Sequence, residues 1–118
     1  MEFRIEEIDP HAMVIEVDGG LNHDTAPQFV ESIEKLIAAG MTELIINCEK
    51  LSYISSYGAG VLMSLHRKMA ERGGNVKLAS VHTFVIDVLR VTRMDSLFDI
   101  YPDVNQAKLA FRKRDEDA

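Results

Sequence analysis

The spacing of apolar residues along the chain predicts a hairpin followed by alternating helices and strands. Apolar and polar side chains alternate over residues 3–6 and again over residues 13–17, on either side of the Asp9-Pro10 break. This pattern is typical of two short strands joined by a turn. Three further strands are predicted after the hairpin, over residues 43–48, 75–79 and 97–101.

Four helices are predicted between and after these strands. The first has clear start signals, because Thr25 offers a capping hydroxyl, Pro27 falls in the first turn and Gln28 follows three residues after the threonine. A stripe of apolar residues from Phe29 to Ile37 then has helical spacing, and Gly40 is its expected stop. The other three helices are expected to follow the turn at residues 55–60, to contain the apolar stripe at residues 84–89, and to begin at the capping pair Asp103 and Gln106.

This order of elements predicts an α/β fold. Strands that alternate with helices bury their apolar faces in a mixed β-sheet, here of roughly four to five strands backed by about four helices. A length of 118 residues suits one domain. We assign residues 1–112 to this domain and the strongly charged residues 113–118 to a solvated C-terminal tail.

The charge balance narrows the classes of partner. The chain has 13 lysine and arginine residues against 19 aspartate and glutamate residues, a net charge of −6, which argues against a general attraction to nucleic acid or anionic membranes. No stretch approaches the roughly 18 consecutive apolar residues of a membrane-spanning helix, and residues 1–4 begin a strand-like alternation in place of a signal peptide. The sequence therefore predicts a cytoplasmic protein.

Few residues suggest metal or thiol chemistry. The single cysteine, Cys48, falls in a predicted buried strand, so we expect a small core side chain and no intrachain disulfide. The four histidines are scattered and lack the spacing of a metal-binding motif. We expect no metal site and no cofactor.

The most informative stretch is the turn at residues 53–60, Tyr-Ile-Ser-Ser-Tyr-Gly-Ala-Gly, between a strand-like and a helix-like run. A helix that starts there aims its free backbone N–H groups and the positive end of its dipole at the turn. The turn could seat a bound phosphate, an acidic side chain of a partner, or a phosphate attached to a serine. The simpler interpretation is that Ser55 or Ser56 caps the helix while Gly58 and Gly60 permit close packing.

Three familiar chemistries do not fit this turn. The nucleophile elbow of a hydrolase needs a glycine two residues before the serine, where Ser56 has Ile54. A phosphate-binding P-loop needs a lysine after its last glycine, but Gly60 is followed by Val61, and a dinucleotide fingerprint needs a third glycine at the position of Met63. No histidine or acid has a sequence context that suggests activation of Ser56, so an enzyme is the least favoured class.

Three segments, in this order, resemble the STAS domain family of bacterial anti-sigma-factor antagonists. Residues 19–26, Gly-Gly-Leu-Asn-His-Asp-Thr-Ala, are similar to the family's Gly-x-Leu-Asp and the Thr-Ala helix start that follows. Residues 51–60 resemble its signature loop, in which an Asp-Ser or Ser-Ser pair precedes x-Gly-x-Gly. Residues 88–101 resemble its third helix and the exit through Leu-Phe, so the resemblance covers nearly the whole chain.

The resemblance implies a non-enzymatic protein that switches between partners. In the family, the second serine of the pair, which falls on Ser56 here, is phosphorylated by the anti-sigma factor, a serine kinase with a histidine-kinase-like ATPase fold. The unphosphorylated antagonist binds this kinase and releases a sigma factor, and a PP2C-type phosphatase removes the phosphate. We expect partner contacts at Asn22, Thr25, Ser55, Ser56, Tyr57, Gly58 and Met63, among which Tyr57 suits an aromatic anchor.

Two positions depart from many phosphorylated members. Ser55 and Asn22 stand where those members have aspartates, so two carboxylates are missing near the expected phosphoacceptor. An alternative function is a non-phosphorylated STAS interaction or scaffold domain in a stress-signalling or lipid-transport complex. Such a domain would use the same surface without a phosphate switch.

Overall fold

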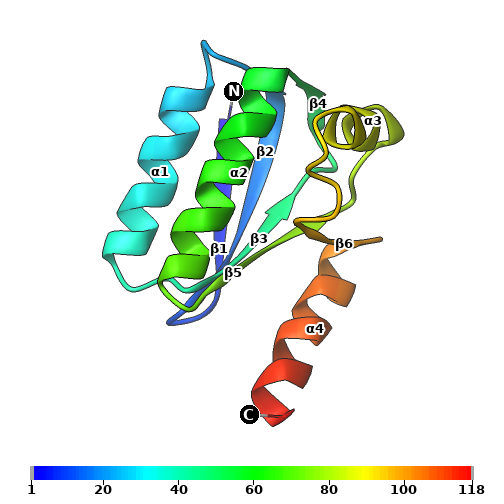
Figure 1. The fold of residues 1–118 in the computed structure, drawn as a ribbon. Helices are drawn as coiled ribbons and strands as arrows, with labels where there is room; N and C mark the ends of the chain where they lie inside the picture. Colours follow the sequence, from blue (N-terminus) through cyan, green and yellow to red (C-terminus); the bar gives the residue numbers. More distant parts are fainter. Residues whose placement is uncertain (1, 118) are drawn as a thin grey trace.

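The computed structural model describes residues 2–117, with side chains described up to Phe111. One sheet carries helices on both faces (Figure 1). The strands are β1 Glu2–Asp9, β2 Ala12–Leu21, β3 Glu43–Asn47, β4 Leu51–Ile54, β5 Asn75–Ala79 and β6 Asp99–Tyr101. The helices are α1 Ala26–Ala38, α2 Ser56–Glu71, α3 Thr83–Val91 and α4 Val104–Asp117.

The sheet is mixed, and the long strand β2 connects most of it. The strand order is β1-β2-β3-β5-β6, and β4 pairs with β2 outside this path. Strand β1 is antiparallel to β2, whereas the other pairs are parallel. The first half of β2, from Ala12 to Glu16, pairs with β3, and its last residues, from Gly19 to Leu21, pair with β4. The carboxyl ends of β2 and β4 therefore lie next to each other.

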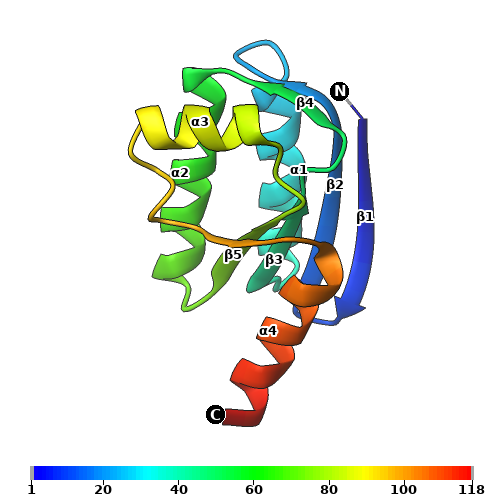
Figure 2. The ribbon, with the colours of Figure 1, turned by 90° about the vertical axis from the view of Figure 1, so that its right-hand side faces the viewer.

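The two faces of the sheet carry different helices. Successive side chains of a strand point to opposite faces, so Leu44 packs in the larger core with α1, α2 and α3, whereas Ile45 packs under α4. The smaller cluster under α4 consists of Val14, Ile45, Ala79, Ala107 and Phe111. These two clusters place α4 on the face of the sheet opposite α1 and α2. Figure 2 shows α4 at the lower end of the sheet and α3 close to β4.

The predicted α/β fold class is confirmed, and the opening hairpin and the four helices are present in the described residues. The sheet has six strands, one more than predicted. The additional strand is β4, of which the two end residues, Leu51 and Ile54, are buried while Ser52 and Tyr53 are exposed. Four residues without strict alternation give no strand signal, and pairing with the end of β2 decides their conformation.

The start of α4 follows its sequence signal, because the Asp103 carboxylate accepts a hydrogen bond from the Gln106 backbone N–H at 2.8 Å. The helix backbone continues to Asp117. The side chains after Phe111 and the whole of residue 118 lie outside the described residues. The division between a domain over residues 1–112 and a charged tail therefore stays a prediction.

The packing of α2 on the sheet predicts a strong effect of truncating its inner face. Leu65 is 8% exposed and lies in the larger core, whereas Leu109 on α4 is 51% exposed. We expect Leu65→Ala to lower the free energy of unfolding by about 2–5 kcal/mol, because it empties a core site. The matched substitution Leu109→Ala should cost less than about 1 kcal/mol. Urea unfolding followed by circular dichroism measures both, and equal costs would contradict this assignment of the core.

Candidate functional site

Two loops meet at the end of the sheet where β2 and β4 terminate. Because these strands are parallel, their carboxyl ends lie at the same edge of the sheet. Residues 22–25 follow β2 and lead into α1, and Ser55 follows β4 and leads into α2. Figure 1 shows both loops at the upper end of the domain, where α1 and α2 begin.

The first turn of α2 lies directly against the last residue of β2. The Ser55 backbone N–H donates a hydrogen bond to the Leu21 carbonyl at 3.0 Å. A Cβ atom on Gly58 would collide with that same carbonyl oxygen, so only glycine allows the helix to approach this closely. A Cβ on Gly60 would meet nothing within 4 Å. The expectation that both glycines serve close packing is therefore wrong for Gly60, which lies on the outer side of the turn.

The two serines of the turn have different roles. Ser55 has an extended backbone, and its hydroxyl oxygen accepts a hydrogen bond from the Gly58 N–H at 3.0 Å, so Ser55 is the N-cap of α2. Ser56 is the first residue of the helix and is exposed. Its hydroxyl has no hydrogen-bond partner among the described residues. Of the two serines, Ser56 is the one whose hydroxyl is available to another molecule.

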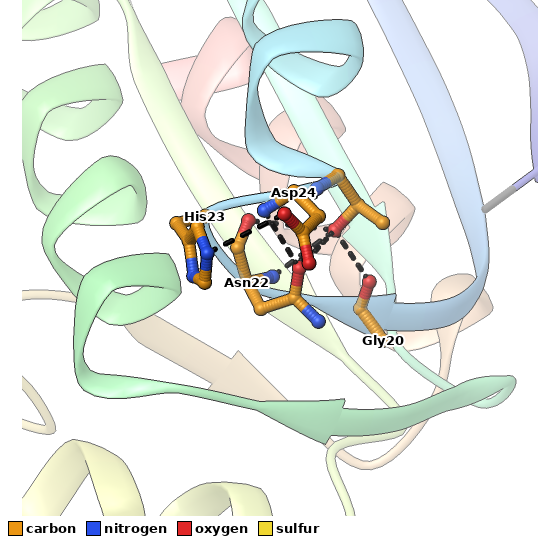
Figure 3. Close-up of polar contacts among 5 residues, drawn as sticks. Gly20, Asn22, His23 and Asp24 are labelled. Atoms are coloured by element: carbon orange, nitrogen blue, oxygen red, sulfur yellow. Dashed lines mark hydrogen bonds and ion pairs between the residues drawn. The ribbon is translucent and has the colours of Figure 1, made fainter.

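The loop after β2 is held by its own polar groups. The Asn22 side-chain oxygen accepts hydrogen bonds from the backbone N–H groups of Asp24, at 2.9 Å, and Thr25, at 3.2 Å. The Thr25 hydroxyl donates to the Gly20 carbonyl at 2.7 Å and accepts from the Asn22 N–H at 3.0 Å. Figure 3 shows these contacts among the residues of the loop. The loop therefore has a defined shape in the absence of a partner.

The Thr25 hydroxyl does not cap α1, although its sequence position suggested a cap. Thr25 is the N-cap residue, but its side chain makes no cap hydrogen bond. The hydroxyl oxygen instead accepts the Asn22 N–H, and its proton is donated to the Gly20 carbonyl at the end of β2, an arrangement that a sequence pattern does not reveal. The proline predicted in the first turn of α1 is present there.

Four exposed side chains lie at this end of the sheet, on α2, on β4 and in the loop after β2. Tyr57 on α2 is 57% exposed and Tyr53 on β4 is 53% exposed. The ring of His23 meets the ring of Tyr57 edge-on, with 6.4 Å between the ring centroids. The Nε2 atom of His23 lies 3.4 Å from the Asp24 carboxylate. Sequence reasoning did not select Tyr53, His23 or Asp24. The contact between His23 and Tyr57 follows from the pairing of β2 with the unpredicted strand β4.

The predicted partner residues differ in how much surface they offer. Ser56 and Tyr57 are exposed. Asn22, Thr25, Ser55 and Met63 are half-buried, and Met63 packs against the larger core. Gly58 is buried. The half-buried polar residues shape the loops through their hydrogen bonds, so the solvent-accessible surface of this set is mainly that of Ser56 and Tyr57. Partner binding at all seven positions stays a prediction.

The site contains little that could support catalysis. The described residues bring no histidine or carboxylate into hydrogen-bond contact with Ser56. Burial raises the pKa of the Cys48 thiol to about 12. The thiol is therefore protonated at neutral pH, whereas a cysteine nucleophile needs the thiolate. Among residues 2–111, whose side chains the structure describes, there is no group of three or more potential metal ligands. In the same part of the chain, no helix has the length and apolar character needed to cross a membrane.

Residues 3–107 match the family model of the STAS domain. The unphosphorylated form of the anti-sigma factor antagonist SpoIIAA is 23% identical to this chain, with a TM-score of 0.84 over 95% of this chain and 97% of SpoIIAA. The phosphorylated form of SpoIIAA, from Bacillus, is 21% identical, with a TM-score of 0.72 over 92% of this chain and 99% of that chain.

The same fold also occurs in a protein of another class. A sulfate transporter family protein from Wolinella succinogenes is 16% identical to this chain, with a TM-score of 0.78 over 96% of this chain and 93% of that chain. At identities below 25%, these solved structures establish the shared fold.

The contact between Gly58 and the Leu21 carbonyl predicts unequal effects of two similar substitutions. Gly58→Ala should lower the free energy of unfolding by about 1–3 kcal/mol, because α2 or β2 must shift to admit the methyl group. Gly60→Ala should be neutral or stabilising by up to about 1 kcal/mol, because alanine favours the helix and meets open space. Thermal and urea unfolding measure both variants. Equal tolerance of the two substitutions would mean that the helix does not approach β2 this closely.

The cap assignment predicts that the two serines differ in their effect on stability. Ser55→Ala should cost about 0.5–2 kcal/mol, because it removes the hydrogen bond to the Gly58 N–H. Ser56→Ala should change the free energy of unfolding by less than about 0.5 kcal/mol, because its hydroxyl is exposed and unbonded within the described residues. Denaturant titrations of both variants test the assignment, and a larger loss for Ser56→Ala would reverse it.

Proposed function

Because the chain belongs to the STAS domain family, we propose that it is an anti-sigma-factor antagonist whose activity is switched by phosphorylation of Ser56. In its unphosphorylated form it binds an anti-sigma factor, which is a serine kinase of histidine-kinase-like ATPase fold, and so releases a sigma factor. The observation that carries the proposal is the state of Ser56, an exposed and unbonded hydroxyl at the first position of α2.

The position of Ser56 suits a reversible phosphate. A phosphoserine carries about −1.5 to −2 charges at neutral pH. At the first residue of a helix this charge faces free backbone N–H groups and the positive end of the helix dipole, so the domain tolerates it. If the partner surface fits the neutral hydroxyl, a phosphate on Ser56 places a negative charge in the interface that no group of the partner compensates. The phosphate therefore acts on the interface and leaves the fold intact.

The proposed exchange needs no catalytic group from this chain. The bound kinase transfers the γ-phosphoryl group of ATP to the Ser56 oxygen, so that an O–P bond forms at the serine, the bond to ADP breaks, and the hydroxyl proton leaves to a base of the kinase. A PP2C-type phosphatase hydrolyses the phosphoserine and restores the hydroxyl. We propose that the chain itself is not an enzyme, in keeping with the lack of a base beside Ser56 in its described residues.

The two departures from the aspartate pattern are compatible with this role. Asn22 uses its amide oxygen to accept the N–H groups of Asp24 and Thr25, which a carboxylate oxygen would also accept. Ser55 caps α2 through its hydroxyl oxygen, and aspartate and serine are comparable N-caps. Both replacements therefore keep a hydrogen-bond acceptor in the required place and remove only its negative charge.

The partner surface that we propose combines the exposed rings with the shaped loops. Tyr57 and Tyr53 offer large aromatic surfaces with polar tips, which is typical of residues that anchor an interface. Asn22, Thr25, Ser55 and Gly58 fix the two loops that present Ser56, and Met63 extends the surface along α2. A STAS interaction domain without the phosphate switch would use the same surface, and the experiment below separates it from the switched antagonist.

The switch predicts that charge at Ser56 weakens partner binding more than loss of the hydroxyl does. With its cognate kinase-like anti-sigma factor, Ser56→Ala should keep its affinity within about threefold, whereas Ser56→Asp should lose about tenfold or more, equivalent to about 1.4 kcal/mol. Ser64→Asp is the matched control, because Ser64 is also exposed on α2 but lies two turns further along the helix. Isothermal titration calorimetry measures the affinities.

Incubation of the two proteins with ATP, followed by mass spectrometry, completes the test. We expect one phosphate, on Ser56, which is absent from the Ser56→Ala variant. Phosphate only on Ser55 or Thr25 would contradict the assignment. Equal affinities of the alanine and aspartate variants, with no phosphate on the wild-type chain, would identify a STAS interaction domain without a switch.

A further inference from the structure

We propose that His23 is the cationic partner of the phosphate on Ser56, and that Asp24 holds its imidazole at the surface until that phosphate is added. The inference rests on the proposed function, because it takes Ser56 as the phosphorylated residue. It assigns a role to two residues of the β2–α1 loop that neither the sequence nor the hydrogen bonds of the loop require.

The position of His23 brings its ring to the first turn of α2. Its ring meets Tyr57 edge-on at a centroid distance of 6.4 Å, and Tyr57 follows Ser56 directly in the chain. Figure 3 shows His23 beside the beginning of this helix, on the side of the loop away from Gly20. The contact is made across two elements, so the placement of His23 depends on the fixed geometry of the loop and the helix.

The backbone of the loop determines this placement. The Asn22 side chain accepts the N–H groups of Asp24 and Thr25, and the Thr25 hydroxyl bonds the Gly20 carbonyl. His23 lies within this short bonded segment, and both its side chain (75% exposed) and that of Asp24 (79% exposed) extend into solvent. The histidine is therefore free to change its partner while its backbone stays in place.

The charges around His23 favour a phosphate as that partner. Among the described residues, the titratable groups in contact with its ring are Asp24 from its own loop and Tyr57 from α2. The basic residues of α2, Arg67 and Lys68, lie about three turns further along the helix, and Lys68 pairs with Glu34 at 2.9 Å. An exposed histidine–carboxylate pair binds weakly, whereas a phosphoserine offers up to two negative charges and three acceptor oxygens.

The proposal makes the pKa of His23 dependent on the state of Ser56. A phosphate beside the ring favours the imidazolium, so the pKa of His23 should rise by about one unit, and the imidazolium should lower the second pKa of the phosphate in return. The imidazolium faces a dianionic phosphate between the second pKa of the phosphate and the raised pKa of His23, and the attraction is lost as the pH rises through the pKa of His23. The phosphate on Ser56 thus gains a positive counterion from the chain's own β2–α1 loop.

The experiment uses the full chain with phosphoserine incorporated at position 56 by genetic encoding, so that no kinase is needed. Two-dimensional NMR across a pH series gives the pKa of each of the four histidines. We expect the pKa of His23 to rise by about one unit, while the pKa of His82, whose Nε2 donates to the Glu49 carbonyl at 2.6 Å, stays unchanged. Phosphoserine at position 64 is the matched control and should leave His23 unchanged.

A second measurement reads the phosphate directly. In ³¹P NMR, His23→Gln should raise the second pKa of phosphoserine 56 relative to the wild-type chain, because the imidazolium is lost. The inference would be overturned if phosphoserine 56 left the pKa of His23 unshifted. It would also be overturned if phosphoserine 64 shifted the pKa of His23 by an equal amount. Either result would leave the proposed antagonist function intact, because that function is tested separately by the anti-sigma factor and the phosphate on Ser56.

Discussion

The carbonyl of Leu21 is the contact on which the rest of the site depends. It ends the strand that pairs with β1, β3 and β4, so its position is fixed by the sheet. The carbonyl accepts the Ser55 N–H and lies against Gly58, which leaves no room for a side chain there. The first turn of α2 is therefore held against the sheet, and the exposure of Ser56 follows from that position.

Polar groups around this contact divide into those that hold the loops and those that face solvent. Asn22, Thr25 and Ser55 are half-buried and use their side-chain oxygens in hydrogen bonds within the loops. Ser56 and Tyr57 are exposed beside them. This division explains how the chain can lack two aspartates near Ser56, the proposed phosphoacceptor, because Asn22 and Ser55 keep the acceptor atoms. The acidic charge that remains in the loop is on Asp24, beside His23.

The opposite face of the sheet is closed independently of the site. Lys77 on β5 is 4% exposed and lies under α4, where its Nζ atom is 3.1 Å from Asp99 and 4.8 Å from the centroid of the Phe111 ring. A buried lysine is tolerated because a carboxylate and an aromatic face compensate for lost hydration. Helix α4 packs against β3, β5 and β6, which leaves the surface around Ser56 uncovered.

The sequence by itself determined the elements whose apolar spacing is regular. The hairpin, the buried strand β3 and the amphipathic helix α1 follow from local periodicity, and Asp103 marked the start of α4 because a cap acts within one turn. The short strand β4, the choice of Ser55 as cap and the proximity of His23 to Tyr57 were decided by the tertiary structure. Strand β4 and the backbone of Ser55 are positioned by hydrogen bonds to the end of β2, and His23 by its contact with Tyr57. These contacts join residues far apart in the chain, and local sequence carries no signal for them.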